Sequence, residues 1–236
     1  MKILAVDTSG PVAGVAVLRD GMLAYEGSAV NKMTHSVNMM PMVEEALNRS
    51  GISIDEIDLF TAVVGPGSFT GVRIGVSAVK GMAHGAGKPC IGVDALEALA
   101  AGLCSVDGVI CPIQDARAGQ VYGAAFRAGM PPERLLPDMA EKLPDYLNQV
   151  LAVAGETEKL YFLGDGVATY RQVIAELLGD RAAFVPAHCS YLRASSVAML
   201  ANVRQDEAVD YLTLMPVYLR APQAERARAA KEAAKV

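Results

Sequence analysis

The chain lacks features that several classes of protein require. Its 236 residues contain no run of about 20 apolar residues, the length that a helix needs to cross a bilayer. The apolar segment at residues 3–6 is too short for a signal peptide. The sequence also has no Cys-x-x-Cys pair and no His-Glu-x-x-His motif, which argues against a zinc-dependent protease. We therefore expect a cytoplasmic protein that does not contact a membrane and whose cysteines stay reduced.

Positive charge is also scarce. Lysine and arginine together number 21, against 26 aspartates and glutamates, so the formal net charge is −5 and the pI is near 5.3. Proteins that bind nucleic acid unaided usually carry a basic face, because binding releases counterions from the phosphates. We expect the isolated chain to bind nucleic acid weakly at most. Its 52% of hydrophobic residues nevertheless excludes a disordered chain.

The order of the predicted elements indicates a duplicated α/β architecture. Three strands followed by alternating helices and strands fill residues 1–104, and a reduced version of this series fills residues 105–222. Within the second series, the prolines near residues 131–137 predict a loop, and residues 215–220 are expected to be extended. Two related lobes that face each other across a nucleotide cleft are typical of the actin-like, sugar-kinase and Hsp70 superfamily. We treat residues 223–236 as a variable tail.

Residues 65–75 form the most informative motif, Gly-Pro-Gly-Ser-Phe-Thr-Gly-Val-Arg-Ile-Gly. The motif lies between a predicted strand and a predicted helix, an arrangement that can direct backbone N–H groups at an anion. It has neither the Gly-Lys-Ser/Thr of a P-loop nor the glycine spacing of a dinucleotide-binding fingerprint. The glycines could equally serve a tight turn and close packing of the helix on the sheet. The candidate anion contacts are Gly65, Gly67, Ser68, Thr70, Gly71 and Arg73.

Together with this motif, four other segments resemble the TsaB (YeaZ) family. They are Ile-Leu-Ala-Val-Asp-Thr at residues 3–8, Thr-His-Ser at 34–36, Asp-Ala-Arg at 115–117 and Pro-Val-Tyr-Leu-Arg at 216–220. The resemblance extends from residue 1 to about residue 222. It implies an α/β, two-lobed actin-like (ASKHA) fold with a degenerate nucleotide cleft. It also implies a dimerisation subunit in the synthesis of threonylcarbamoyladenosine in tRNA.

The resemblance further implies specific partners. The related TsaD-type subunit transfers the threonylcarbamoyl group to N6 of adenosine-37, and a TsaE-type ATPase sustains turnover. We expect this chain to form homodimers, to bind the TsaD-type subunit, and to meet the ATPase and tRNA only through that complex. We expect no catalytic residue and no tightly bound cofactor, with ATP and Mg²⁺ binding only weakly or within the complex. The alternative left open is an autonomous ATPase or small-molecule kinase of the same fold.

The residues that would hold a metal differ from those of the catalytic relative. That relative uses two histidines four residues apart, whereas here His35 is followed by Met39. A thioether is a poor ligand for hard divalent cations, so we expect no metal site.

The predicted vestigial nucleotide cleft consists of Asp7, Asp115, Gly164 and Gly166. Asp7 and Asp115 end the first strand of each lobe, where active relatives orient Mg²⁺ and the attacking water. They could keep that role, or they could bond the backbone of their own turns. Asp165, between Gly164 and Gly166, places a negative charge where adenine or phosphate should approach, which weakens the case for nucleotide binding.

The helix predicted over residues 34–49 is the candidate partner-binding element. If Val43 and Leu47 face the sheet, further apolar side chains remain at the side of the helix. Methionine is common at adaptable binding surfaces, although a deeply buried helix would also explain the pattern. The predicted partner surface consists of His35, Met39, Met42 and Ala46. A second apolar surface around residues 72–86 could serve self-association.

Overall fold

Two five-stranded mixed sheets organise the chain in a computed structural model that describes residues 1–30 and 34–220. The first sheet consists, in the spatial order β3-β2-β1-β4-β5, of β1 (Lys2–Asp7), β2 (Ala13–Arg19), β3 (Met22–Ala29), β4 (Leu59–Gly65) and β5 (Cys90–Asp94). The second sheet consists, in the order β10-β9-β6-β7-β8, of β6 (Val109–Asp115), β7 (Gln120–Arg127), β8 (Glu133–Lys142), β9 (Leu160–Leu163) and β10 (Ala182–Phe184). In each sheet the first strand pairs antiparallel with the next strand and parallel with the strand on its other side. This repeated topology confirms the predicted duplication.

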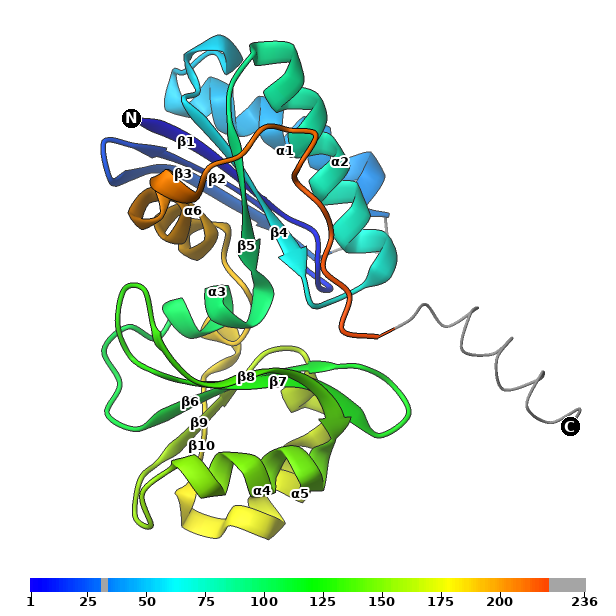
Figure 1. Ribbon diagram of the computed structural model, residues 1–236, viewed down its shortest axis with the longest axis vertical. Coiled ribbons are helices and arrows are strands. Elements are labelled where there is room, and N and C mark those ends of the chain that lie inside the picture. Colours follow the sequence, from blue (N-terminus) through cyan, green and yellow to red (C-terminus); the bar gives the residue numbers. More distant parts are fainter. Residues whose placement is uncertain (31–33, 221–236) are drawn as a thin grey trace, which may run out of the picture.

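Helices cover both faces of each sheet (Figure 1). The outer face of the first sheet is covered by α1 (His35–Ser50) and α2 (Phe69–Ala86), and the outer face of the second by α4 (Leu143–Val153) and α5 (Gly166–Leu178). Between the sheets lie α3 (Ala95–Ala101) and α6 (Ala194–Val203). Short 3-10 turns complete the described chain: η1 (Ile54–Glu56), η2 (Gly179–Arg181), η3 (Ala187–Cys189) and η4 (Gln205–Glu207). None of the helices within residues 1–30 and 34–220 is long and apolar enough to span a membrane.

The last part of the chain returns to the first lobe. Helix α6 packs against all five strands of the first sheet, most closely against β1 and β2. The predicted boundary at residue 104 separates the two sheets, but the assignment of residues 105–222 to one lobe needs correction, because the second sheet ends with β10. Hydrophobic periodicity predicts a buried helix at α6, but it does not indicate which sheet buries that helix. The predicted tail at residues 223–236 lies outside the described residues.

Residues 208–220, the C-terminal strap, run beside α2 in Figure 1. The strap begins as a bridge to β5, where the backbone N–H groups of Cys90 and Val209 donate to each other's carbonyls at 2.9 and 2.8 Å. Lys80 Nζ then donates to the Leu214 carbonyl at 3.0 Å, and Leu214 is buried in the outer core of the first lobe. The strap is therefore anchored along its length although it forms no strand of either sheet.

Strand β8 lies where the prolines predicted a loop. Pro131 and Pro132 precede the strand, but Pro137 lies inside it. Within the described residues, strand β8 is at the edge of the second sheet and pairs with β7 alone. An edge strand tolerates a residue that lacks an N–H donor, so Pro137 does not prevent pairing.

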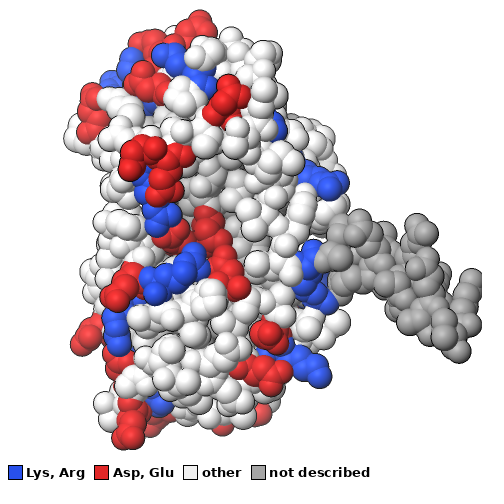
Figure 2. Space-filling view, viewed as in Figure 1, with Lys and Arg blue, Asp and Glu red and all other residues white. Residues whose placement is uncertain are grey.

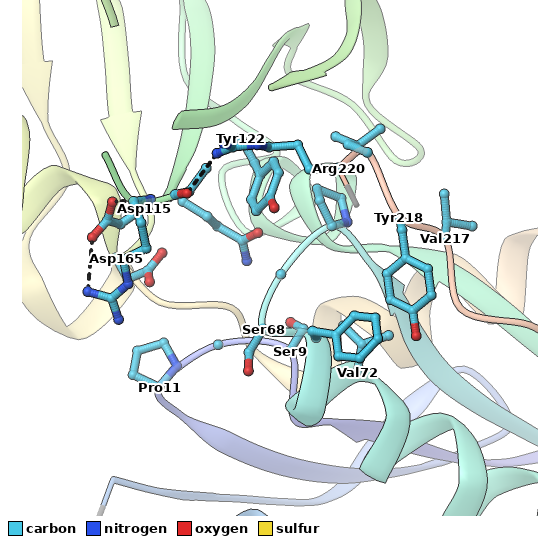
Figure 3. Close-up of a pocket in the computed structure, with 18 residues that line it drawn as sticks. Ser9, Pro11, Ser68, Val72, Asp115, Tyr122, Asp165, Val217, Tyr218 and Arg220 are labelled. Atoms are coloured by element: carbon cyan, nitrogen blue, oxygen red, sulfur yellow. Dashed lines mark hydrogen bonds and ion pairs between the residues drawn. The ribbon is translucent and has the colours of Figure 1, made fainter. Parts of the chain in front are cut away.

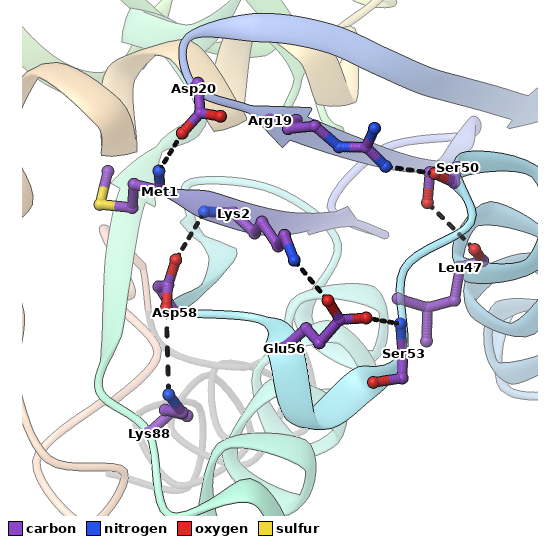
Figure 4. A network of polar contacts seen from close by, with 10 residues as sticks. All are labelled: Met1, Lys2, Arg19, Asp20, Leu47, Ser50, Ser53, Glu56, Asp58 and Lys88. Atoms are coloured by element: carbon purple, nitrogen blue, oxygen red, sulfur yellow. Dashed lines mark hydrogen bonds and ion pairs between the residues drawn. The ribbon is translucent and has the colours of Figure 1, made fainter.

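Polar contacts hold the N-terminus against its neighbours (Figure 4). The N-terminal ammonium pairs with Asp20, and the backbone N–H of Lys2 donates to Asp58 Oδ2 at 2.8 Å. The Lys2 ammonium pairs with Glu56, whose other oxygen accepts the Ser53 N–H at 2.9 Å and caps η1. These groups are partly exposed, so each ion pair adds little to stability.

A bidentate ion pair joins the two middle helices. Arg204, which follows α6, donates from Nη1 to Glu97 Oε2 at 2.8 Å and from Nη2 to Glu97 Oε1. The Glu97 side chain, on α3, is only 5% exposed. A buried carboxylate requires such a partner, since an unpaired charge in this environment would be costly.

Candidate functional site

A cleft of about 440 Å³ lies between the lobes (Figure 3). The turn after β1 and the glycine loop after β4 form its first-lobe wall, through residues 9–11 and 66–69. The end of β6 and the following turn form the second-lobe wall, through residues 114–117 together with Asp165. Residues 217–220 of the C-terminal strap close one side. The cleft thus collects residues from both repeats; of the residues predicted for a nucleotide cleft it is lined by Asp115, whereas Asp7, Gly164 and Gly166 are not among its lining residues.

The glycine loop is bonded tightly to the turn after β1. The Ser68 N–H donates to the Ser9 carbonyl at 2.7 Å, and Thr8 Oγ1 donates to the Gly71 carbonyl at 2.7 Å. A Cβ atom at Gly71 would lie 2.0 Å from the Thr8 carbonyl oxygen. Ser68 also caps α2 by accepting the Gly71 N–H at 3.3 Å. These contacts favour the packing interpretation of the motif, because they occupy the Ser68 N–H that an anion would need.

Gly65, Gly67 and Arg73 of the motif also contact neighbouring segments of the chain. Gly65 has φ +129°, and a Cβ there would lie 2.4 Å from the Val217 carbonyl oxygen. The Arg73 guanidinium lies 3.7 Å from the centre of the Phe69 ring and donates from Nε to Tyr218 Oη at 2.7 Å. Gly67 approaches the turn after β1, and Thr70 is exposed in the first turn of α2. Anion binding by this motif stays a prediction.

Asp7 and Asp115 both bond their own turns. Asp7 Oδ1 accepts the Ser9 N–H at 2.8 Å, and Asp115 Oδ1 accepts the Arg117 N–H at 2.8 Å. The Asp115 carboxylate also pairs with the Arg117 guanidinium at 3.4 Å. Asp7 is only 2% exposed, and its burial raises its pKa to about 6. The structure contains the hydrogen bonds that the turn interpretation predicts.

The second-lobe wall carries polar atoms that lack partners. Gly164 bonds its N–H to the Ser190 carbonyl at 2.7 Å, and Gly166 begins α5. Between them, Asp165 Oδ1 has no hydrogen-bond partner among the described residues, and neither has Gln114 Oε1. Sequence analysis missed Gln114, although its position next to Asp115 at the end of a predicted strand could have indicated it.

Two of the predicted partner contacts on α1 are buried in the core. Met39 and Ala46 are 3% and 0% exposed and pack with Val43 against the first sheet, so their assignment to a partner surface is wrong. The residues 39, 43 and 46 follow the i, i+4, i+7 pattern of one helix face, whereas we had expected Val43 and Leu47 to define it. Met42 is half-buried. The apolar side chains that α1 exposes are Val37 and Met40, which are 51% and 48% exposed.

His35 fastens the start of α1 to the first-lobe wall of the cleft. Its Nε2 lies 2.9 Å from the Gly10 carbonyl oxygen, at hydrogen-bond distance. Across residues 1–30 and 34–220, no three His, Cys, Asp or Glu side chains gather into a group that could hold a metal ion. His35 therefore makes a contact within the first lobe, and the absence of a metal site stays a prediction.

We expect Asp7→Asn to change the pH dependence of stability. The folded pKa of about 6 exceeds the ordinary value of 3.8, so the folded state holds the proton more tightly than the unfolded state. The stabilisation that comes from this tighter proton binding is complete below pH 4 and is lost as the pH rises through 6. The amide oxygen of the substituted side chain can still accept the Ser9 N–H, but the amide does not ionise. Relative to the unchanged chain, Asp7→Asn should therefore gain up to about 3 kcal/mol between pH 4 and pH 7.

Urea unfolding of both chains at pH 4, 5, 6 and 7 measures this difference. Asp55→Asn, a change at an exposed position on η1, serves as the control and should show no such trend. Parallel pH profiles for Asp7→Asn and the unchanged chain would show that Asp7 is ionised at no cost in the folded state.

Comparison with known proteins identifies the family to which this chain is similar. The family model described as TsaD, tRNA N6-adenosine threonylcarbamoyltransferase, matches residues 29–228. The tRNA threonylcarbamoyladenosine biosynthesis protein TsaB of Bacillus subtilis is 36% identical over 227 residues, which cover 95% of this chain and 96% of that protein. A Pseudomonas aeruginosa structure with similarity to peptidase YeaZ has a TM-score of 0.77 and 26% identity, covering 93% of this chain and 99% of that one.

A more distant structure extends the comparison at the level of the fold. Component A of (R)-2-hydroxyglutaryl-CoA dehydratase from Acidaminococcus fermentans has a TM-score of 0.50 and 11% identity, covering 87% of this chain and 99% of that one. At that identity the likeness concerns the fold alone, and it agrees with the duplicated two-lobed, actin-like topology. The match along nearly the whole length of the Bacillus subtilis protein is more specific, and by it this chain belongs to the TsaB (YeaZ) family.

Proposed function

We propose that the chain is a non-catalytic subunit that dimerises and binds a TsaD-type transferase, and thereby supports threonylcarbamoylation of N6 of adenosine-37 in tRNA. The names of its relatives support a role in threonylcarbamoyladenosine biosynthesis. The match to the TsaD family model supports a fold shared by this chain and the transferase. Two subunits with the same fold can pair through corresponding faces. A role on tRNA agrees with the cytoplasmic location expected from the sequence.

The observation that carries the proposal is the outward face of α1 and α2. Helix α1 exposes Val37 and Met40 to solvent, although both are large apolar side chains. On the neighbouring α2, the exposed Ser77 and Gly81 are small, and a Cβ added at Gly81 would meet no atom within 4 Å. Exposed apolar side chains on α1, together with small residues on α2, allow helices of another subunit to approach this surface closely. We assign this face, rather than Met39 and Ala46, to the subunit interface.

Contacts to tRNA are proposed to come through the complex, as are those to a TsaE-type ATPase. On the face shown in Figure 2, acidic and basic side chains lie next to one another at the seam between the lobes. With a net charge of −5, such interleaving gives little of the counterion release that drives binding to phosphates.

The alternative is an autonomous ATPase or small-molecule kinase, which would use Asp7 and Asp115. Both carboxylates lie at the predicted strand ends, but both bond their own turns, and the Ser68 N–H of the glycine loop is occupied. These contacts support the subunit role over the enzyme. Titration of ATP with Mg²⁺ tests the alternative, which requires micromolar affinity and turnover by the isolated chain.

We expect Met40→Glu to prevent association without unfolding the chain. Because Met40 is half exposed, a charge there stays hydrated in the free chain, and stability should change by less than about 0.5 kcal/mol. In a complex the same charge would be buried without a partner, at a cost of several kcal/mol. Thermal unfolding followed by co-purification with the TsaD-type subunit measures both effects.

Two further variants serve as controls. Met39→Glu places the charge in the core and should unfold the chain, whereas Leu177→Glu changes an exposed apolar residue on α5 and should leave both fold and complex intact. If Met40→Glu still forms the complex and the homodimer, this face is not the interface. If only the Leu177→Glu chain loses the complex, the partner binds the second lobe.

A further inference from the structure

The interlobe cleft has unsatisfied hydrogen-bond acceptors on its second-lobe wall. Gln114 is 5% exposed and ends β6, and its Oε1 has no partner among the described residues. Asp165 precedes α5, and its Oδ1 is equally unpartnered. Both residues line the 440 Å³ cleft and also a cavity of about 10 Å³ beside it, which is roughly the space of one water molecule. Buried acceptors without partners are rare in folded proteins, so this pair indicates a missing donor.

The second-lobe wall of the cleft also carries two neighbouring carboxylates, so its acidic side chains are negative. Figure 3 shows Asp115 and Asp165 next to each other, across the cleft from Pro11 and Ser9. Burial raises the pKa of Asp165, and the negative charge of Asp115 also raises it, whereas backbone hydrogen bonds at Asp115, Asp165 and Gly166 offset part of this shift. A cation placed against this wall would stabilise both carboxylates.

The arginines of the cleft do not supply that cation to Asp165. Arg117 pairs with Asp115, and its side chain is 85% exposed. Arg220, on the C-terminal strap, donates from Nη1 to the Ala116 carbonyl at 2.9 Å. Both guanidinium groups are therefore directed at other acceptors, and the Asp165 carboxylate keeps an unpaired oxygen.

We propose that the cleft binds an organic cation, a primary ammonium or a guanidinium group, whose N–H donors bond Gln114 Oε1 and Asp165 Oδ1. Such a group supplies several donors and a positive charge, which match two acceptors and a carboxylate pair. The cleft volume lies within the range of small-molecule sites. A nucleoside triphosphate fits less well, because its phosphates would meet the carboxylates of this wall. The residues of this site are not those proposed for the subunit interface on α1 and α2.

Calorimetric titration of the purified chain with 1,4-diaminobutane tests the proposal, with Mg²⁺ alone and ATP with Mg²⁺ as separate titrants. We expect saturable binding of the diamine at one site per chain. Asp165→Asn should weaken it at least tenfold, equivalent to about 1.4 kcal/mol, because it removes the charge and keeps the shape. Gln114→Met, which removes the acceptor, should weaken it as well. Asp180→Asn, which removes the same charge at the other end of α5, should leave the affinity unchanged.

A repeat of the titration with the chain bound to the TsaD-type subunit distinguishes two sources of the cation. Unchanged affinity for the diamine indicates a free small molecule, and loss of binding indicates a lysine or arginine side chain of the partner. Either result supports a cation site. Equal affinities of the Asp165→Asn and Asp180→Asn chains, or binding of ATP with Mg²⁺ but not of the diamine, would overturn it. Neither of these results depends on whether Met40→Glu prevents association.

Discussion

Gly71→Ala should destabilise the chain by about 3 kcal/mol or more, whereas Gly81→Ala, in the same helix, should stabilise it by up to about 1 kcal/mol. The added methyl at residue 71 would lie 2.0 Å from the Thr8 carbonyl oxygen, a backbone atom held in the turn after β1. Relief of that overlap requires α2 and the turn to separate, which breaks the bond from Thr8 Oγ1 to the Gly71 carbonyl. At residue 81 the methyl meets no atom and only lowers the entropy cost of forming the helix.

Urea unfolding of the two variants at a concentration where the chain is monomeric measures both values. The pair also tests what the glycine loop does. If Gly71→Ala leaves stability unchanged while anion binding is lost, the glycine serves a ligand and the packing interpretation is wrong. Opposite signs for the two variants would confirm that close contact between the glycine loop and the turn after β1 explains the motif.

Arg204→Leu should destabilise the chain by about 3 to 5 kcal/mol, because it leaves the Glu97 carboxylate buried without its bidentate partner. The side chain of Glu97 is 5% exposed and lies on α3, in the layer between the sheets, so little water can reach it in place of the guanidinium. The double variant Glu97→Leu with Arg204→Leu should recover most of the loss, since apolar side chains suit this layer.

The exposed ion pair of Arg49 with Glu45 on α1 provides the comparison for this cycle. Arg49→Leu removes an arginine that makes one 3.7 Å ion pair at a hydrated surface, and it should change the unfolding midpoint little. If Arg204→Leu behaves like Arg49→Leu, then water reaches Glu97 and the middle layer is less tightly closed than its burial indicates. A double variant as unstable as Arg204→Leu would show that packing of the long side chains, rather than charge, dominates.

Local pattern predicts most of the helices and strands of this protein. The Asp20-Gly21 turn and the apolar runs around it predict β2 and β3, and Gly51 predicts the end of α1, where it adopts the left-handed φ of +63° that favours glycine. Strand β8 escapes prediction because its prolines are compatible with pairing only at a sheet edge, and the edge position follows from topology. The same limit applies to α6, whose pattern shows that it is buried but not by which sheet.

The candidate site was predicted unevenly, for related reasons. Asp115 carries a recognisable signal, since it lies beside turn residues at the end of a predicted strand, whereas Asp165 is recognisable only as a charged residue between two glycines that weakens the case for a nucleotide. Gln114 has no such signal, because a glutamine becomes informative only when its acceptor is buried and unpartnered. The exposed face of α1 could not be derived either, because apolar residues occur on more than one side of this helix and their pattern does not show whether Met39 or Met40 faces the sheet.

The return of α6 to the first sheet has a consequence for synthesis on the ribosome. Strands β1 to β5 are complete once residue 94 has left the exit tunnel, but the face of that sheet buried by α6 stays uncovered until residues 194–203 emerge. During the translation of about half the chain, this apolar surface is open to water and to other nascent chains. The first lobe therefore cannot finish folding ahead of the second sheet, and the emergence of residues 194–203, rather than completion of each repeat, sets the moment at which the first lobe closes.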